Sequence, residues 1–462
     1  MTRASPQRLL AATLLAACAA NSCATEPERA AATEPSAGHT QPSTGPNLVV
    51  VYCDDLGWGD LASYGHPTIR TPRLDRMAAE GARFTQFYSG SPACTASRYA
   101  LMTGRVPKRS GFSWVLGPKS PRGLHENETT VAEGLQRAGY ATAVFGKWHL
   151  GRPDRHLPLA HGFDEYLGLP YSNDMQPPRW VSLPLIEGND VVELDPDQTR
   201  LTELYTDRAL GFIERHRDRP FFVYLPYAMP HVPLHPGEEF AGTSTRGTYG
   251  DVVEEIDHHV GRLLDRLTEL GLAGDTLVLF TSDNGPWIIK DDEGGSSGLL
   301  RDGKGSTWEG GVRVPAILWQ PGTIEPGRVI RSVASTLDLL PTAFAMAGEP
   351  LPNGRAVDGR DLHPVLAGEE PQRDPLFFYG PKKLHAVRSG PWKLHVHTSS
   401  QTGVEHFDGR VPLLFHLERD PSERWDVSEE HPEVVEALLA EIAAHEAEVA
   451  RTGTDWDGAR AR

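Results

Sequence analysis

Short apolar runs that end abruptly in polar residues recur along this chain, and they restrict its fold more than any other feature. Each run has the length and composition of a buried β-strand. Continuous apolar runs of this kind are typical of strands covered on both faces, as in parallel sheets. The runs are residues 47–53, 82–88, 141–145, 221–225 and 276–280, and a further strand is expected over 314–319.

Helical patterns alternate with these strands. Thr71, followed by proline, is expected to cap the first helix, and Gly81 to end it. The other expected helices cover residues 130–138, 206–217, 249–270 and, interrupted at Pro341, 333–347. This alternation predicts an α/β fold with a large mixed, mainly parallel sheet flanked by helices, and residues 187–198 are expected to be a surface insertion.

The pattern changes near residue 375. Strand-like segments at 384–388 and 392–396 flank a Ser-Gly-Pro turn, and a third strand is expected at 413–418. A helix rich in alanine and glutamate is expected over 432–451. We therefore predict a main α/β domain over 47–374, and a C-terminal subdomain, an antiparallel sheet with a helix, over 375–462.

The N-terminus has the features of an export signal. Two arginines precede an apolar run over residues 9–20 that is too short to span a bilayer. Residues 15–18, Leu-Ala-Ala-Cys, resemble a bacterial lipoprotein cleavage box, which makes Cys18 a candidate lipidation site; an ordinary signal peptide cut nearby is the alternative. We predict a signal peptide over 1–17, a disordered tether over 18–46, and location in the periplasm or cell envelope, with this anchor as the only membrane contact.

Charge and cysteine content narrow the function. The net charge of −17 argues against a nucleic-acid-binding protein, which needs a basic face. Without Cys18, three widely spaced cysteines remain, too few for a disulfide framework. Cys53 at the end of a strand is expected to be a buried structural thiol. Cys94 lies in a small-residue turn; if a helix starts near Ser97, its N-terminus would lower the thiol pKa.

Polar residues follow five strands at the point where each ends. Ligands of such sheets bind beyond the carboxyl ends of the strands, so we expect one shared site. The residues are Asp54 and Asp55, Cys94, Lys147 and His149, His231, and Asp283 and Asn284.

The types of these side chains indicate a metal centre beside an anion pocket. Carboxylate and amide oxygens from the two Asp-containing pairs favour a hard cation, calcium or magnesium, over zinc. A tetrahedral oxyanion could be held by Arg98, Lys147 and Lys304, the last carried over the site by a flexible glycine-rich loop. His149 and His231 could transfer protons near neutral pH.

Five motifs, in order, resemble those of the formylglycine-dependent sulfatase family, most closely its arylsulfatase A type. The resemblance begins near Asn47 and extends into the C-terminal region. One of these motifs is the signature Cys94-Thr95-Ala96-Ser97-Arg98, together with Leu-Met-Thr-Gly-Arg at residues 101–105. One position departs from the family: Ala96 stands where the commonest signature has proline, which bears on how efficiently Cys94 is modified. The others cover residues 54–60, 146–151, 282–286 and 303–311.

The resemblance implies an alkaline-phosphatase-like fold and hydrolysis of an aryl or carbohydrate sulfate ester. It implies that a formylglycine-generating or equivalent enzyme oxidises Cys94 to formylglycine, whose hydrate is the nucleophile. It also implies a role for each site residue. Ca²⁺, or Mg²⁺ as the alternative, would be held by Asp54, Asp55, Asp283, Asn284 and modified Cys94. The hydrate would be stabilised by Arg98 and Lys147, and His149 would assist sulfate elimination. Sulfate would be bound by Lys304 and His231, which would also help protonate the leaving alcohol, and Ser172 would lie near the sulfate.

Two rival functions are open to a chain of this kind. One is a phosphodiesterase or phosphonate hydrolase on the same scaffold, which would share the metal ligands. The other is a non-catalytic, lipid-anchored protein that binds sulfated glycans; its expected mark, loss of Cys94, Arg98 or a metal ligand, is absent from the sequence. The loops over 152–198 and 395–407 are expected to line the substrate pocket.

Overall fold

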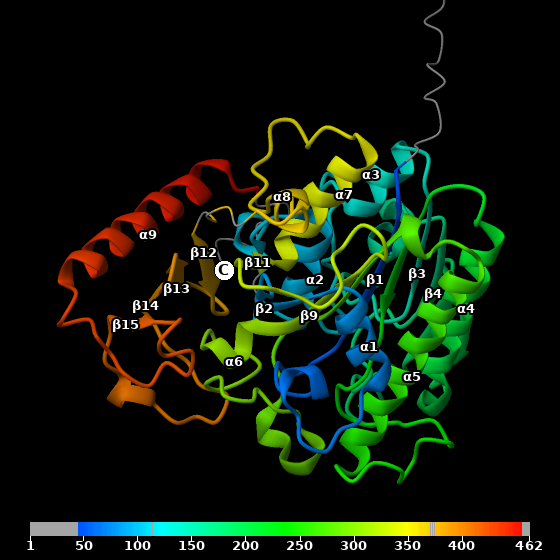
Figure 1. Cartoon of the computed structure of the whole chain (residues 1–462), viewed down its shortest axis with the longest axis horizontal. Helices are drawn as coiled ribbons and strands as arrows, with labels where there is room; N and C mark the ends of the chain where they lie inside the picture. Colours follow the sequence, from blue (N-terminus) through cyan, green and yellow to red (C-terminus); the bar gives the residue numbers. More distant parts are fainter. Residues whose placement is uncertain (1–44, 113, 370, 372, 374, 455–462) are drawn as a thin grey trace, which may run out of the picture. The chain divides into compact units, whose positions relative to one another are not determined.

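The computed structural model describes residues 45–454 except 113, 370, 372 and 374, so the signal peptide, Cys18 and nearly all of the tether lie outside the described residues. Its central element is β1 (Asn47–Cys53), which is buried along its whole length. It pairs in parallel with β7 (Phe221–Pro226) on one side and β8 (Thr276–Ser282) on the other. The first apolar run thus forms the middle of the large sheet (Figure 1).

The large sheet is mixed and mainly parallel, as predicted. β3 (Ala141–Phe145) continues it in parallel beyond β7, followed by β4 (Glu165–Gly168). On the other side β9 (Arg313–Trp319) runs antiparallel to both β8 and β2 (Ala82–Tyr88). Among the described residues the strand order is β10-β2-β9-β8-β1-β7-β3-β4-β5-β6, with β10 (Arg328–Ile330) and β11 (Ala334–Ser335) both paired with β2.

Alternating side chains of β1 supply two hydrophobic cores. Val49 and Val51 pack with α1 (Pro72–Glu80), α4 (Leu201–Arg215) and α5 (Thr248–Glu269) on one face. Leu48 and Val50 pack on the other face with α2 (Cys94–Thr103), α3 (Val131–Arg137) and α7 (Leu339–Ala347). Since successive strand residues point to opposite faces, a continuous apolar run is what a sheet covered on both faces requires.

Several boundaries differ from the predicted ones. Residues 333–347 are not one helix: β11 comes first, and Pro341 lies in the first turn of α7, where proline is tolerated. Thr71 precedes α1 without capping it through its side chain, whereas Thr130 forms a capping box with Glu133 at α3. Helix α4 begins at Leu201, five residues before the expected start. Part of the expected insertion forms the hairpin of β5 (Pro184–Glu187) and β6 (Asp190–Leu194), which extends the sheet.

A separate antiparallel sheet near the C-terminus is confirmed. It contains β12 (Leu376–Tyr379), β13 (Leu384–Ser389), β14 (Trp392–His395) and β15 (Leu413–His416), of which β12 was not predicted. The helix that follows is α9 (Pro432–Thr452). The short helices α6 (Glu309–Val312) and α8 (His363–Leu366) complete the α-helices among the described residues. No helix in the described part of the chain is both long and apolar enough to cross a bilayer.

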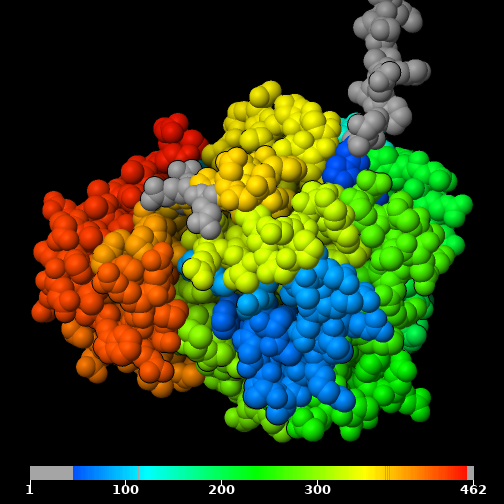
Figure 2. All heavy atoms as spheres, in the orientation of Figure 1, coloured from blue at the N-terminus to red at the C-terminus, as the bar shows by residue number. Residues whose placement is uncertain are grey.

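Buried charges attach this sheet to the rest of the fold. Lys393 of β14 lies 2.8 Å from Glu309 of α6 and 3.1 Å from Glu423, and all three side chains are inaccessible to solvent. Figure 2 shows the orange and red atoms of the C-terminal residues packed directly against the green and yellow atoms of the preceding ones. The sheet is therefore held to the region that follows Lys304 in the chain.

Candidate active site

The carboxyl ends of β1 and β8 bring the two expected carboxylate pairs together. The Asp55 backbone N–H donates to Asp283 Oδ1 at 3.1 Å, and Asn284 Nδ2 donates to Asp55 Oδ1 at 2.6 Å. Asp55 has a φ of 67°, a left-handed conformation that a non-glycine residue adopts only when its surroundings hold it there. The sharp turn after β1 thus directs Asp55 towards the end of β8.

Cys94 is the first residue of α2, so the helix begins earlier than the expected start near Ser97. Its side chain is buried, with 1% of the residue exposed. Burial raises the pKa of the Cys94 thiol far above its ordinary value, which corrects the expectation that the helix N-terminus would lower it. Ser97 fixes this first turn, because its hydroxyl bonds both Tyr52 of β1 and Ser89 at 2.8 Å.

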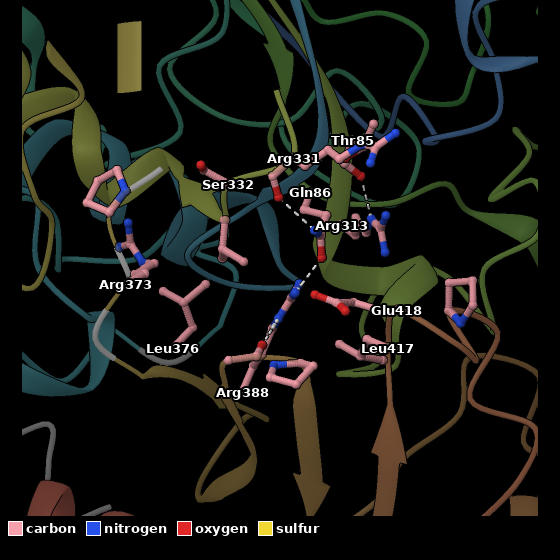
Figure 3. Close-up of a pocket in the computed structure, with 15 residues that line it drawn as sticks. Thr85, Gln86, Arg313, Arg331, Ser332, Arg373, Leu376, Arg388, Leu417 and Glu418 are labelled. Carbon is pink, nitrogen blue, oxygen red and sulfur yellow. Dashed lines mark hydrogen bonds between the residues drawn. The ribbon is translucent and has the colours of Figure 1, made fainter. Parts of the chain in front are cut away.

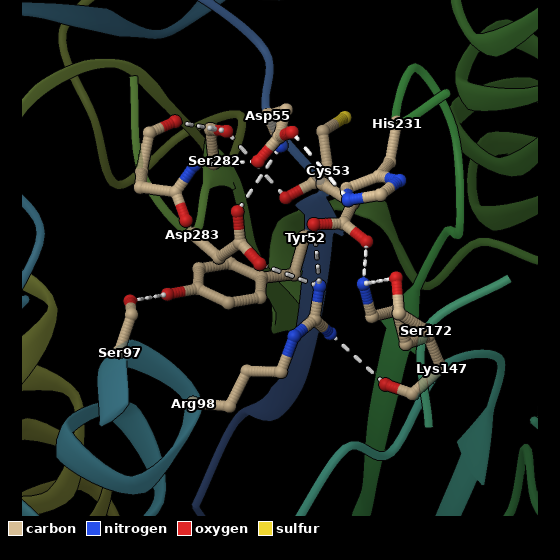
Figure 4. A network of polar contacts seen from close by, with 12 residues as sticks. Tyr52, Cys53, Asp55, Ser97, Arg98, Lys147, Ser172, His231, Ser282 and Asp283 are labelled. Carbon is tan, nitrogen blue, oxygen red and sulfur yellow. Dashed lines mark hydrogen bonds and ion pairs between the residues drawn. The ribbon is translucent and has the colours of Figure 1, made fainter. Parts of the chain in front are cut away.

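Arg98 links α2 to the ends of two strands. Its Nη2 donates to Asp283 Oδ2 at 2.8 Å, and its Nη1 donates to the Lys147 carbonyl at 2.9 Å (Figure 4). Both ion-pair partners are inaccessible to solvent. The guanidinium also lies over the Tyr52 ring, 5.4 Å from its centroid. Arg98 therefore determines how Cys94, one helical turn earlier, lies relative to the carboxylates.

Lys147 follows β3 and contacts the group from the opposite side. Its ammonium donates to Asp54 Oδ2 and to Ser172 Oγ, the latter at 3.0 Å (Figure 4). Burial alone would raise the pKa of Asp54, but the cations Lys147 and Arg98 outweigh it and hold that pKa well below its usual range. Asp54 is thus a carboxylate at neutral pH.

Lys304 and His231 both approach Asp55. Lys304 Nζ lies 2.7 Å from Asp55 Oδ2, and His231 Nε2 lies 3.7 Å from the same oxygen. Burial opposes the charge of Lys304, yet Asp55 and its neighbours raise the Lys304 pKa above its ordinary value. Burial and then Lys304 hold the pKa of His231 well below its ordinary value. This side of the site pairs a permanent cation with a neutral imidazole.

His149 is placed by an unusual backbone conformation. Its φ is 57°, and its Nε2 lies 3.0 Å from the Leu116 carbonyl oxygen. Its Nδ1 is buried without a hydrogen-bond partner among the described residues. Burial, followed by Lys147 and Arg98, holds the His149 pKa well below its ordinary value. The imidazole is therefore neutral at pH 7, with one nitrogen available to a ligand.

The donor set fits a hard divalent cation. Ligand atoms of Asp54, Asp55, Cys94 and His231 lie within 4.8 Å of one another. Asp54 Oδ1 and Asn284 Oδ1 are buried and accept no hydrogen bond from the described residues. Burial, with Asp54 nearby, raises the pKa of Asp283 to about 7, so the carboxylates repel one another here. Oxygen atoms that lack donors in a crowded carboxylate group are what a bound Ca²⁺ or Mg²⁺ would satisfy.

Comparison with known proteins accounts for most of the chain. The family model "Sulfatase" matches residues 46–349, and the model "C-terminal region of aryl-sulfatase" matches residues 371–459. The chain belongs to the sulfatase family. The predicted resemblance, the alkaline-phosphatase-like fold class and the activity of a sulfuric ester hydrolase are thereby confirmed.

Relatives of this sulfatase cover similar lengths. Arylsulfatase A of Bos taurus is 43% identical over 440 residues, 86% of each chain. N-acetylgalactosamine-6-sulfatase of Canis lupus familiaris is 39% identical over 446 residues, 87% of this chain and 85% of the relative. Among solved structures, the PsFucS1 sulfatase of Pseudoalteromonas sp. has a TM-score of 0.82 at 29% identity, covering 89% of this chain and 92% of that one.

Two residues that the sequence did not single out adjoin Lys304 in this sulfatase. Trp287 lies beneath the Lys304 ammonium, 4.6 Å from the ring centroid, and 5.3 Å from the His231 ring. The Gln401 side chain donates to the carbonyls of Pro286 and Lys304 at 3.3 and 2.8 Å. The sequence held one clue to each residue. Gln401 falls within the loop that was expected to line the pocket, and Trp287 comes directly after the Asp-Asn-Gly-Pro motif.

Proposed function

We propose that this sulfatase releases inorganic sulfate from a carbohydrate or aryl sulfate ester, with formylglycine made from Cys94 and with Ca²⁺, or Mg²⁺ as the alternative. The observation that carries the proposal is the position of Cys94. Its sulfur belongs to the group in which the ligand atoms of Asp54, Asp55 and His231 lie within 4.8 Å of one another. An inert structural thiol would not need a metal site and a set of cations around it.

Two groups supply chemistry that the unmodified residues lack. A hydrated aldehyde at position 94 would supply one hydroxyl able to attack sulfur and a second able to lose a proton so that sulfate can leave, and a bound cation would supply positive charge. Asp54, Asp55, Asp283 and Asn284 are the residues that would hold that cation. The carboxylates come from two strands that pair along their whole length, so the ligand set is positioned before any substrate enters.

The cationic residues receive the sulfate group. Lys304 stays protonated because of Asp55, so it can offer N–H donors and charge to sulfate oxygens throughout the neutral range. Lys147 donates to Ser172 as well as to Asp54, which places both groups on the same wall. Both Nη atoms of Arg98 donate to protein atoms, to the Lys147 carbonyl and to Asp283, so Arg98 acts by orienting position 94 and Lys147. These groups face the charge that develops as the ester bond breaks.

The two histidines fit proton transfer in opposite directions. A neutral His149, with its Nδ1 unpartnered among the described residues, can accept the proton whose loss releases sulfate. His231 lies beside Lys304 and Trp287, at the most exposed part of the group, and it can exchange a proton with the departing alcohol. Export of the chain, and its anchorage through Cys18, belong to this proposal as the route by which the enzyme meets extracellular sulfate esters.

Mass spectrometry of the peptide that contains Cys94, combined with sulfate release, tests the proposal. Protein from a host with a formylglycine-generating enzyme is expected to carry the aldehyde at position 94 and to hydrolyse 4-nitrophenyl sulfate. The Cys94→Ser variant is expected to fold but to lose turnover. Active protein with an unmodified thiol would refute the mechanism, and faster turnover of the corresponding phosphate ester or phosphonate would favour the rival activity. Free sulfate measured across a panel of sulfated sugars then identifies the alcohol.

A further inference from the structure

A large cavity lies apart from the candidate active site, lined by residues of β2 and β9 in the large sheet and of β12 and β13 in the C-terminal sheet. It holds about 680 Å³ and is lined by Gln86 of β2, by Arg331 and by Arg388 of β13, among others. Figure 3 shows Arg313, Arg331 and Arg388 around the side chain of Gln86. None of the lining residues belongs to the proposed catalytic or metal-binding set. Its volume is in the range of cavities that hold small organic ligands.

Arg388 is a buried cation whose partners are neutral. The residue is 3% exposed. Its Nε donates to the Gly390 carbonyl at 3.3 Å, and its two Nη atoms donate to Tyr88 Oη and Gln86 Oε1. Within the described residues no carboxylate lies within ion-pair distance of it. Its link to a carboxylate is indirect, because the Tyr88 hydroxyl that accepts from Arg388 donates in turn to Glu309 at 2.6 Å. Burial of a charge without a direct counter-charge is unfavourable, so this guanidinium would gain from an anion in the cavity.

The other charges that line the cavity leave it cationic. Arg331 is exposed and forms no ion pair with a described residue, whereas Arg313 is compensated by Glu309 at 3.2 Å. Arg373 is compensated in the same way by Asp338. Glu418 is exposed, and it is the only carboxylate among the lining residues that the structure describes. Among the described residues, Arg331 therefore has no ion-pair partner, and Arg388 reaches a carboxylate, Glu309, through the Tyr88 hydroxyl, in a chain whose net charge is −17.

We infer that this cavity is a second anion site that binds a sulfate group of a saccharide chain, with Arg331 and Arg388 as its donors. Guanidinium groups match the oxygen geometry of sulfate through forked hydrogen bonds. The identification of the ligand as a sulfated saccharide rests on the proposed function, whereas the anion site itself rests on Arg331 and Arg388, neither of which forms an ion pair with a described residue. A chain bound here by one sulfate group while another reaches Lys304 would be held at two points.

Calorimetry on Cys94→Ser protein, which cannot turn over substrate, tests the inference. A sulfated hexasaccharide is expected to occupy two classes of site. Arg331→Ala is expected to weaken one class about tenfold, because it removes a charge-assisted forked contact. Glu418→Gln is expected to tighten the same class a few-fold, about the effect of removing one screened like charge. The matched control is Arg217→Ala, an exposed arginine just after the end of α4 that does not line the cavity, and binding by this variant should equal that of the parent.

Kinetics on the mature enzyme separate this site from the catalytic one. Arg331→Ala should leave kcat/KM for 4-nitrophenyl sulfate within about twofold of the wild type, and raise KM for a long sulfated saccharide about tenfold. Unfolding midpoints equal to the wild type's confirm that the variant is folded. Equal saccharide binding by the Arg331 and Arg217 variants would overturn the inference. Inorganic sulfate binding as tightly as the saccharide at the Arg331-dependent site would overturn its saccharide part.

Failure of this inference and failure of the proposed function give different results. If wild-type enzyme released no sulfate from any ester, the proposed function would fall, yet calorimetry would still show Arg331-dependent binding of the hexasaccharide. If esters were hydrolysed while the Arg331 and Glu418 variants behaved like the Arg217 control, the second site alone would fall.

Discussion

Replacement of Arg98 by alanine is expected to affect stability and catalysis together. The guanidinium makes a 2.8 Å contact with Asp283 and a 2.9 Å contact with the Lys147 carbonyl, all out of contact with solvent. The alanine variant leaves Asp283 buried without its cation. Removal of one partner from a buried ion pair costs about 3–5 kcal/mol, several times the cost at an exposed pair.

The stability change can be converted to a melting temperature. An unfolding entropy of about 2.1 cal/mol/K per residue, over the roughly 400 residues that the structure describes, corresponds to about 0.8 kcal/mol/K. A loss of 3–5 kcal/mol then lowers Tm by about 4–6 °C. Because the variant also releases Lys147 and the first turn of α2, kcat for 4-nitrophenyl sulfate is expected to fall at least about 10²-fold.

Calorimetric melting without added cations measures the stability, and matched variants test the cause. Arg215→Ala removes an exposed pair, Arg215–Glu165, at 2.7 Å, and should lower Tm by no more than about 1 °C. Arg98→Lys keeps the charge but cannot reach both acceptors, so stability should recover in part while kcat remains low. In the double variant Arg98→Ala/Asp283→Asn, the unpaired charge is gone and much of the lost stability should return.

Two results would refute this reasoning. A Tm for Arg98→Ala within about 1 °C of that for Arg215→Ala would show that Asp283 does not depend on its cation. Additive losses in the double variant would show that the two residues stabilise the fold independently.

Three further changes have separate expected outcomes. Gln401→Ala should lower kcat/KM about tenfold, because it removes the hydrogen bond that holds the backbone at Lys304. The free energy of unfolding should fall by less than about 1 kcal/mol, because no buried charge is left unpaired. Unchanged kinetics would contradict this prediction. Ala96→Pro should fold normally, since residue 96 lies in the first turn of α2, where the N–H has no intrahelical acceptor. Mass spectrometry should show a larger fraction of formylglycine at position 94 than in the wild type. A smaller fraction of formylglycine would contradict the interpretation of Ala96. Glu309→Gln should make the free energy of unfolding less dependent on pH in acid. Lys393, with other cations, outweighs burial and lowers the Glu309 pKa from 4.5 to about 2, so the wild-type carboxylate contributes stability above pH 4.5 that is lost as pH falls towards 2. Melting curves across that pH range should differ in slope between the two proteins, and parallel curves would contradict the assignment.

Much of the fold could be predicted because strand burial is a local pattern. The run 47–53 is apolar at every position except its first, a pattern that is typical of a strand covered on both faces. Polar residues directly after such strands had to meet at one edge, and the structure places Asp54, Asp55, Asp283 and Asn284 together there. Local capping signals were less reliable: Thr71 was expected to cap α1, yet its hydroxyl is used by Ala62 and Asp75.

The sequence by itself determined the buried strands at the centre of the large sheet, the motifs and the types of side chain that the site contains. The tertiary structure alone decided what surrounds each of them. The pKa of the Cys94 thiol is raised by burial and is not lowered by the helix N-terminus. Burial dominates because desolvation depends on atoms from the whole fold. Gln401 reaches Lys304, and Arg388 reaches Gln86, across 97 and 302 positions of sequence. No local pattern encodes such contacts, because they exist only once the C-terminal sheet has packed against the large one.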